Sequence, residues 1–90
     1  MLESTLEGRC RLWALSQHSV KSRKLYKSIG DPDRIFFKAG KLIFVEFKRP
    51  GEKPRAIQVH VHNTLRLDGF DVFVIDNFED FKKIIIQIFS

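Results

Sequence analysis

Apolar residues recur along the chain at helical and strand-like spacings, so the pattern predicts an alternation of the two elements. Leu2, Leu6, Cys10 and Trp13 fall at the spacing of one helix face, whereas runs rich in aromatic and β-branched residues indicate strands. The order α-β-β-β-α-β-α places the chain in the α/β class. The predicted elements are a helix over Leu2–Gln17, strands over Val20–Tyr26, Arg34–Phe37 and Leu42–Phe47, a helix from Pro54 to Gly69, a strand over Phe70–Ile75, and a helix after Asp76 through Phe89.

The last predicted helix is apolar over most of its circumference. Asp76 and Glu79 form a candidate capping box at its start. Phe81 and Ile85 belong to one apolar stripe, and further Ile and Phe residues widen that stripe beyond a single face. A helix of this kind must be buried on more than one side, so we expect a homodimer contact. A terminal strand over Ile84–Phe89 is the alternative interpretation.

A β-hairpin is predicted from Arg34–Phe37 and Leu42–Phe47, because Ala39-Gly40 between them is a candidate two-residue turn. With that turn, Asp33 lies directly opposite Glu46. Opposed residues of antiparallel strands hold their Cβ atoms about 4.5 to 5.5 Å apart. Two carboxylates at this distance can share one divalent cation.

Glu46 and Lys48 share a strand face because they are two residues apart, so both lie beside Asp33. Two adjacent carboxylates repel each other without a cation. Mg²⁺ removes this conflict, since it takes one or two carboxylates together with water. The alternative interpretation gives Asp33 a turn-capping role after Pro32 and makes Glu46 and Lys48 a surface ion pair.

The spacing of Asp33, Glu46 and Lys48 along the chain is similar to that of a known sequence signature. Pro32-Asp33, twelve intervening residues and Glu46-x-Lys48 resemble the PD-(D/E)xK nuclease signature. A wider set of positions, reaching from about Glu7 to the last helix, is similar to the VRR-NUC family within that superfamily, in particular to its stand-alone virus-type members. This set comprises Gly30-x-Pro32-Asp33-Arg34-Ile35, Phe44-Val45-Glu46-Phe47-Lys48-Arg49-Pro50-Gly51, Gln58, Leu65 and Gly69.

The resemblance implies a small mixed β-sheet flanked by helices, with a restriction-endonuclease-like core. It also implies a metal-dependent endonuclease that hydrolyses phosphodiester bonds in branched DNA, such as four-way (Holliday) junctions, as a homodimer. The expected cofactor is Mg²⁺, with Mn²⁺ as a substitute, and no small-molecule cofactor is expected. The resemblance implies catalytic roles for Glu7, Asp33, Glu46, Lys48 and Gln58.

Asp33, Glu46 and the backbone carbonyl of Phe47 are the expected metal ligands under this resemblance, with Glu7 as a further candidate. The family places a glutamate on its first helix at the metal site, and Glu3 is the rival of Glu7 for that position. Independently of the family, Glu7 follows Ser4 by three residues and could instead complete a capping box at the helix start.

The charge of the chain favours a polyanion as partner. The sequence holds 16 Lys and Arg against 11 Asp and Glu, giving a net charge of +5 and a pI near 9.7. His60 and His62 are two apart and point away from each other on a helix, so we expect surface or phosphate-near positions and no zinc site. The candidate DNA-binding residues are Lys21, Arg23, Lys24, Lys27, Arg49, Lys53 and Arg55.

The composition fits one small domain over residues 1–90 in a reducing compartment. With Cys10 alone, the sequence excludes an intramolecular disulfide. The apolar run Ile84–Phe89 is too short to span a bilayer, and no signal peptide is recognisable. We therefore expect a cytoplasmic location, or a host-intracellular one for a viral protein, and no membrane partner.

Two other functions fit the same residues. One is a nucleic-acid-binding module, or a nuclease that depends on a partner and has no cleavage activity of its own. The other is a toxin-like or restriction-like nuclease that cuts at a defined base sequence. The clustered acidic residues argue against a module kept for binding alone, because they repel phosphate.

Overall fold

Three helices and a four-stranded sheet make up the part of the chain that the computed structural model describes, residues 5–26 and 29–90. The predicted α/β class and element order are confirmed, and the boundaries move by a few residues. The elements are α1 (Leu6–His18), β1 (Lys21–Lys24), β2 (Arg34–Lys38), β3 (Lys41–Phe47), α2 (Ala56–Leu67), β4 (Asp71–Ile75) and α3 (Phe78–Phe89).

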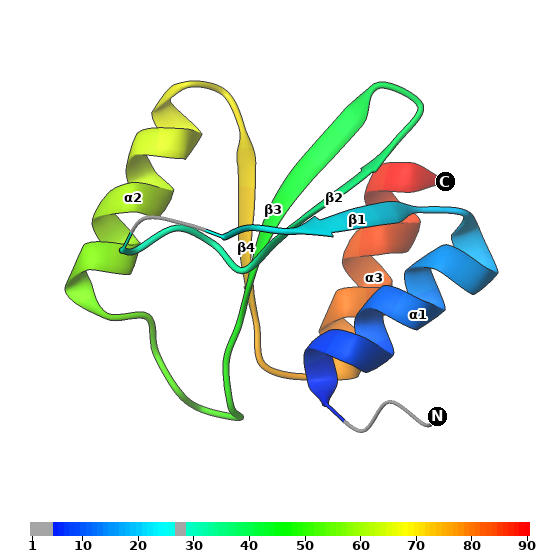
Figure 1. Cartoon of the computed structure of the whole chain (residues 1–90), viewed down its shortest axis with the longest axis horizontal. Helices are drawn as coiled ribbons and strands as arrows, with labels where there is room; N and C mark the ends of the chain where they lie inside the picture. The colour runs from blue at the N-terminus through cyan, green and yellow to red at the C-terminus, as the bar shows by residue number, and fades with distance from the viewer. Residues whose placement is uncertain (1–4, 27–28) are drawn as a thin grey trace.

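The sheet is mixed and its strands follow chain order, β1-β2-β3-β4. β1 pairs with β2 and β2 with β3 in antiparallel fashion, whereas β3 and β4 are parallel. A parallel pair needs a crossover connection, and α2 supplies it. Helices α1 and α3 cover one face of the sheet and α2 lies on the other (Figure 1).

The predicted hairpin and its register are confirmed. Ala39 and Gly40 form the turn with φ angles of 52° and 82°. Left-handed values at both central residues suit the turns that join twisted antiparallel strands. Lys38 pairs with Lys41 and Arg34 with Val45, so continuing the ladder brings Asp33 opposite Glu46.

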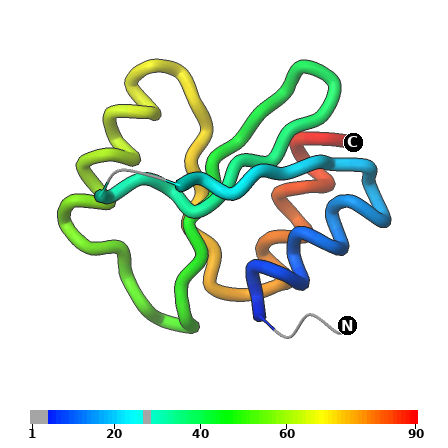
Figure 2. The backbone as a smooth tube through the Cα atoms, in the orientation of Figure 1, coloured from blue at the N-terminus to red at the C-terminus, as the bar shows by residue number. Residues whose placement is uncertain are grey.

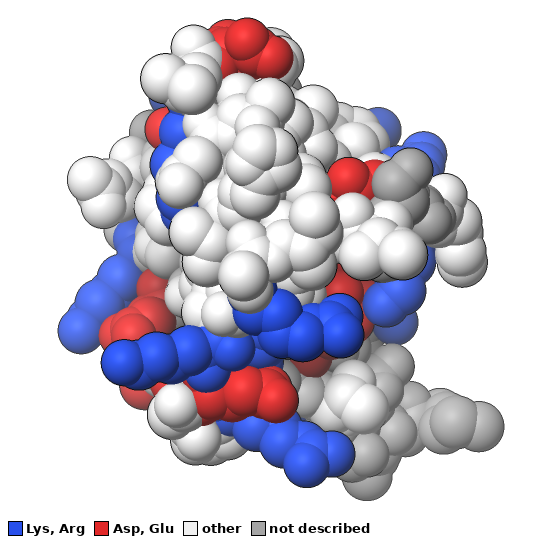
Figure 3. All heavy atoms as spheres, turned by 90° about the vertical axis from the view of Figure 1, so that its left-hand side faces the viewer, with Lys and Arg blue, Asp and Glu red and all other residues white. Residues whose placement is uncertain are grey.

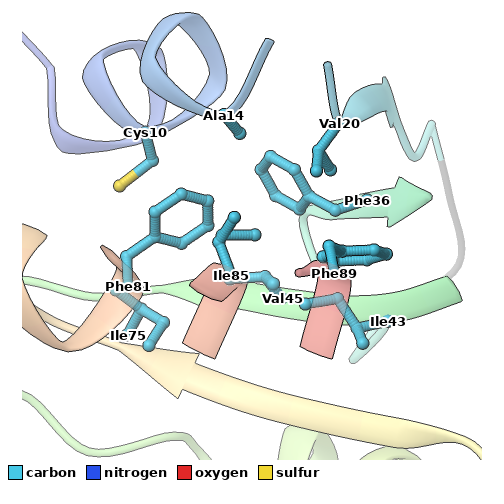
Figure 4. Packing of buried hydrophobic residues seen from close by; sticks show 10 residues of the cluster. All are labelled: Cys10, Ala14, Val20, Phe36, Ile43, Val45, Ile75, Phe81, Ile85 and Phe89. Atoms are coloured by element: carbon cyan, nitrogen blue, oxygen red, sulfur yellow. The ribbon is translucent and has the colours of Figure 1, made fainter. Parts of the chain in front are cut away.

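One apolar core lies between the sheet and the pair α1 and α3. Cys10 and Ala14 from α1 point toward Phe81, Ile85 and Phe89 from α3, and side chains of the strands complete the cluster (Figure 4). The strand side chains and the residue before β1 that complete it are Val20, Phe36, Ile43, Val45 and Ile75.

The apolar character of α3 follows mainly from this core. Phe81, Ile85 and Phe89 are buried and Ile84 is partly buried, while Ile86 is 50% exposed. The segment is helical throughout, so the alternative of a terminal strand is wrong. Among residues 5–26 and 29–90, no helix combines the length and the apolarity that crossing a membrane requires.

Both terminal helices begin one or more residues later than predicted. Thr5 caps α1, because its side chain accepts a hydrogen bond from the Gly8 N–H at 3.0 Å. Glu3 and Ser4 lie outside the described residues. Asn77 caps α3 by accepting from the Asp80 N–H at 2.9 Å. The predicted capping box at this helix is therefore wrong, since the cap stands one residue further on than Asp76.

Candidate active site

Asp33, Glu46, Lys48 and Gln58 line one pocket of about 410 Å³. It opens where β3 ends, beside the loop that leads into β2 and the first turn of α2. We call it the carboxylate pocket. Four of the five predicted catalytic residues thus come together, although they are spread over 26 positions of the chain, from residue 33 to residue 58.

Asp33 is fixed by the ends of the hairpin. Its N–H donates to the Val45 carbonyl at 3.1 Å, which extends the ladder by one residue. Its Oδ2 accepts from the Phe47 N–H at 2.8 Å. The carboxylate is therefore bound to the backbone next to Glu46, and the local hairpin alone brings the two acids together.

Gln58 connects the sheet to α2. Its Oε1 accepts from the Arg55 N–H at 2.9 Å, at the start of the helix, and its Nε2 donates to Glu46 Oε2 at 2.9 Å. The first bond orients the amide, so the NH₂ group faces the carboxylate. Glu46 is 3% and Gln58 6% exposed, which makes this a buried and directed contact.

Lys48 completes the set beside the same carboxylate oxygen of Glu46 that Gln58 binds. Its Nζ lies 3.6 Å from Glu46 Oε2, and its side chain is only 11% exposed. The Lys48 N–H donates to the Ile75 carbonyl at 2.9 Å, which continues the pairing of β3 with β4. The pair is nearly enclosed, so the alternative of an ordinary surface ion pair does not describe it.

Gly30 allows α2 to lie close to the loop that carries Asp33 and leads into β2. Its φ is 89°, and a Cβ here would lie 2.9 Å from the Ile57 carbonyl oxygen and 2.9 Å from Val61 Cγ2. The left-handed backbone and the lack of space both require glycine. The glycine thereby allows the Asp33 loop and the Gln58 helix to pack against each other.

The donor set fits a hard divalent cation. Asp33 and Glu46 offer two carboxylates, and Mg²⁺ characteristically takes one or two carboxylates, with water and phosphate oxygens as its other ligands. Within the ranges 5–26 and 29–90, no three His, Cys, Asp or Glu side chains cluster as metal ligands. Asp33 and Glu46 could therefore hold Mg²⁺ together with water molecules.

Comparison with known proteins places this geometry in a family. A solved structure described as a VRR_NUC domain matches the chain with a TM-score of 0.74 and 32% sequence identity, covering 93% of this chain and 98% of that one. The chain belongs to the VRR-NUC family. This confirms the resemblance that the sequence indicates, together with the restriction-endonuclease-like fold.

A phage protein adds support to this VRR-NUC assignment. The protein, named "Putative nuclease p44", comes from Acyrthosiphon pisum secondary endosymbiont phage 1 and is 44% identical over 57 residues. The aligned segment is 62% of this chain and 60% of the phage protein, so the chain spans about three fifths of that relative. No family model matches the chain. The two relatives support a nuclease, and the carboxylate pocket is its candidate active site.

Glu7, the fifth predicted catalytic residue of this VRR-NUC chain, is engaged elsewhere. Its Oε2 lies 3.0 Å from Lys24 Nζ and 3.0 Å from Arg34 Nε. It lines a neighbouring pocket and not the one that holds Asp33. Metal binding by Glu7 stays a prediction that requires these ion pairs to be exchanged.

His62 belongs to the buried surroundings of the VRR-NUC site, although a surface or phosphate-near position was expected from the sequence. It is 1% exposed, and its Nε2 has no hydrogen-bond partner among the described residues. It follows Gln58 by four residues, so the two share one face of α2, and this spacing could have revealed its place. Burial lowers the pKa of His62, the charges of Arg66 and Lys48 lower it further, and Asp33 opposes them.

Acidification should therefore destabilise the fold through His62. The folded state holds the imidazole neutral, whereas the unfolded chain takes up a proton near pH 6.5. The free energy of unfolding should fall as the pH drops below about 6.5, by up to about 1.4 kcal/mol per pH unit until the folded-state pKa is reached. Urea unfolding of wild type and His62→Gln at pH 7.5 and 5.5 measures the difference.

The matched control is His60→Gln, since His60 is exposed on the same helix. It should keep the pH dependence of the wild type, whereas His62→Gln should lose part of it. An NMR titration of the wild-type imidazole gives the pKa of His62 directly. A value above 6.5 would contradict the expectation.

The predicted DNA-contacting residues form two groups around this VRR-NUC site. Lys21, Arg23 and Lys24 lie on the edge strand β1, where Lys24 pairs with Glu7. Lys27 lies outside the described residues. The second group of predicted residues is exposed in the loop before α2. On the side toward α2, Lys and Arg side chains gather below a surface without charged side chains, and acidic side chains lie among them (Figure 3). The second group consists of Arg49, Lys53 and Arg55, the last of which lines the carboxylate pocket.

Proposed function

We propose that this VRR-NUC protein is a Mg²⁺-dependent, structure-specific DNA endonuclease that cuts branched DNA, such as four-way junctions, as a homodimer. The observation that carries the proposal is the meeting of Asp33, Glu46, Lys48 and Gln58 in one pocket. Two buried or half-buried acids beside a lysine are the donor set that a metal-assisted phosphodiester hydrolysis needs.

Each residue has a distinct task in this reaction. Asp33, Glu46 and the backbone carbonyl of Phe47 would hold Mg²⁺, or Mn²⁺ in its place. The metal supplies charge neutralisation at the phosphate and a water of lowered pKa. Lys48 orients the attacking water or stabilises the negative charge that develops on the phosphate. Gln58 keeps the Glu46 carboxylate in place through the 2.9 Å bond.

The preference for branched DNA and the homodimer are proposed from the family and from symmetry. A four-way junction presents symmetry-related strands, and a two-fold dimer presents two equivalent active sites. The net charge of +5 favours binding of the DNA backbone without reading its sequence.

Cleavage assays with labelled DNA test the proposal. A four-way junction and a linear duplex of the same sequence are incubated with the purified chain in Mg²⁺, Mn²⁺ or EDTA. We expect cutting with either metal, none with EDTA, and faster cutting of the junction. Light scattering of the same sample should give the mass of a dimer.

Each alternative function has its own result in this assay. Salt-dependent binding without cutting in any metal would replace the proposal by a binding module or a partner-dependent nuclease. Products of uniform sequence from long linear DNA would indicate a restriction-like enzyme. If a monomer cuts both strands of the junction symmetrically, the proposed homodimer is wrong.

A further inference from the structure

A second pocket, of about 690 Å³, adjoins the carboxylate pocket. Its lining comes from the start of α1, the end of β3 and the turn from β4 into α3. Figure 2 shows these three segments near one another at the lower end of the molecule. Its volume falls within the range of about 300 to 1,000 Å³ typical of ligand pockets. We call it the flanking pocket, and its lining includes Leu6, Arg9, Phe47, Pro50, Asp76 and Phe78.

Lys48 lines both pockets. The two pockets therefore adjoin at Lys48, so a DNA strand whose phosphate is held there runs past the flanking pocket. The group next to a bound phosphodiester is a nucleoside of the same strand. A nucleoside is therefore the expected occupant of the flanking pocket.

The flanking pocket has the chemistry of a base-binding site. Leu6, Phe47, Pro50 and Phe78 supply apolar surface. The Arg9 guanidinium lies over the Phe78 ring, 4.7 Å from its centroid. A planar guanidinium held in place on a ring is a platform of the kind on which unpaired bases stack.

The three acidic side chains that line this pocket, Glu7, Glu52 and Asp76, all bind groups of the protein, and Glu7 pairs with Lys24 and Arg34. Asp76 accepts from the Gly51 N–H at 3.0 Å, and this bond, followed by one from Asn77, keeps the pKa of Asp76 below its usual value. Glu52 accepts from the Arg49 N–H at 3.2 Å. The bond from Gly51 to Asp76 also joins the loop after β3 to the segment before α3, whereas the bond between Arg49 and Glu52 lies within that loop.

We propose that the flanking pocket binds the base of the nucleotide next to the scissile phosphate, unstacked from its neighbours. The inference rests on the proposed nuclease function and adds to it a reason for substrate choice. A base inside a duplex reaches such a pocket only after unpairing, which costs least at a branch point or a mismatch. Recognition by stacking also tolerates every base, so the selection is for local DNA structure.

Abasic substitution tests this inference on the intact chain. The cut position in the four-way junction is mapped first, and the nucleotide on either side of it is then replaced in turn by an abasic analogue. Loss of the base on one side should lower kcat/KM about 10-fold or more, the effect expected for one stacked base. Loss of the base on the other side should have a smaller effect.

Variants of Arg9 connect the effect to the pocket. Arg9→Ala and the charge-conserving Arg9→Lys should both cut the intact and the abasic junction at nearly equal rates, because the planar platform is lost. Lys83→Ala, which removes a cation from an exposed position of α3 outside both pockets, should keep the full wild-type difference.

Outcomes for the inference and for the nuclease function are separable. If the chain cuts the junction but treats every abasic substrate like the intact one, the base pocket is wrong and the nuclease function stands. If Arg9→Lys keeps the full difference, the platform assignment is overturned. If no DNA is cut in any metal, the nuclease function fails and the inference fails with it.

Discussion

Glu46→Gln should lower the single-turnover rate of DNA cleavage by about 10³-fold or more, because the substitution removes one of two charged metal ligands while keeping the shape of the side chain. The glutamine carbonyl can still accept the hydrogen bond from Gln58 Nε2, so the fold should survive. Cleavage of a labelled junction in saturating Mg²⁺ gives the rate, and thermal unfolding confirms that the variant is folded.

The matched control for this variant is Glu79→Gln. Glu79 is an exposed glutamate in the first turn of α3, and it lies outside both pockets. It should keep a rate within about 10-fold of the wild type, as most surface substitutions have small effects. Equal rates for Glu46→Gln and the wild type would show that Glu46 does not bind the metal that drives the reaction.

Phe81→Ala should be the most damaging substitution for stability, with a loss of about 3–5 kcal/mol in the free energy of unfolding. Phe81 is fully buried, and its ring centroid lies 5.1 Å from that of Phe36, 6.2 Å from Phe47 and 6.3 Å from Trp13. Its removal leaves a cavity between α1, α3 and the sheet. Urea unfolding followed by circular dichroism measures the loss.

Ile86→Ala on the same helix serves as the control, since Ile86 is 50% exposed and should cost less than about 1 kcal/mol. Domains of this size have a total stability of about 5–15 kcal/mol, so Phe81→Ala could leave little folded protein. In that case Phe81→Leu, with its smaller cavity, gives a measurable loss. A loss for either Phe81 variant no larger than that of Ile86→Ala would contradict the packing described here.

Local physics made the hairpin and its two acids predictable from the sequence. Ala39 and Gly40 fix the turn, the turn fixes the register, and the register brings Asp33 opposite Glu46. The side of the sheet that Lys48 faces follows from the two-residue period of a strand. These relations involve neighbours along the chain and need no knowledge of the tertiary fold.

Relations between distant segments were harder to predict. The burial of His62 depends on how α2 docks, and that docking uses the close approach of Gly30 to Ile57, although the spacing of His62 from Gln58 places both residues on one face of the helix. The ion pairs of Glu7 depend on where α1 crosses the strands that carry Lys24 and Arg34. The start of α3 was misplaced by one residue because Asp76 and Asn77 are both good capping residues, and Asp76 binds the Gly51 N–H instead.

The turn of the hairpin also offers a place to attach a reporter dye. Ala39 and Gly40 are exposed, and the seven residues of β3 separate them from the Phe47 end of the strand by about 20 Å. Cys10, the single cysteine of the sequence, is fully buried, and burial raises the pKa of its thiol to about 12. A cysteine introduced as Ala39→Cys would thus react with a maleimide dye while Cys10 stays protected. The labelled protein could then report DNA association by fluorescence anisotropy with its catalytic groups untouched.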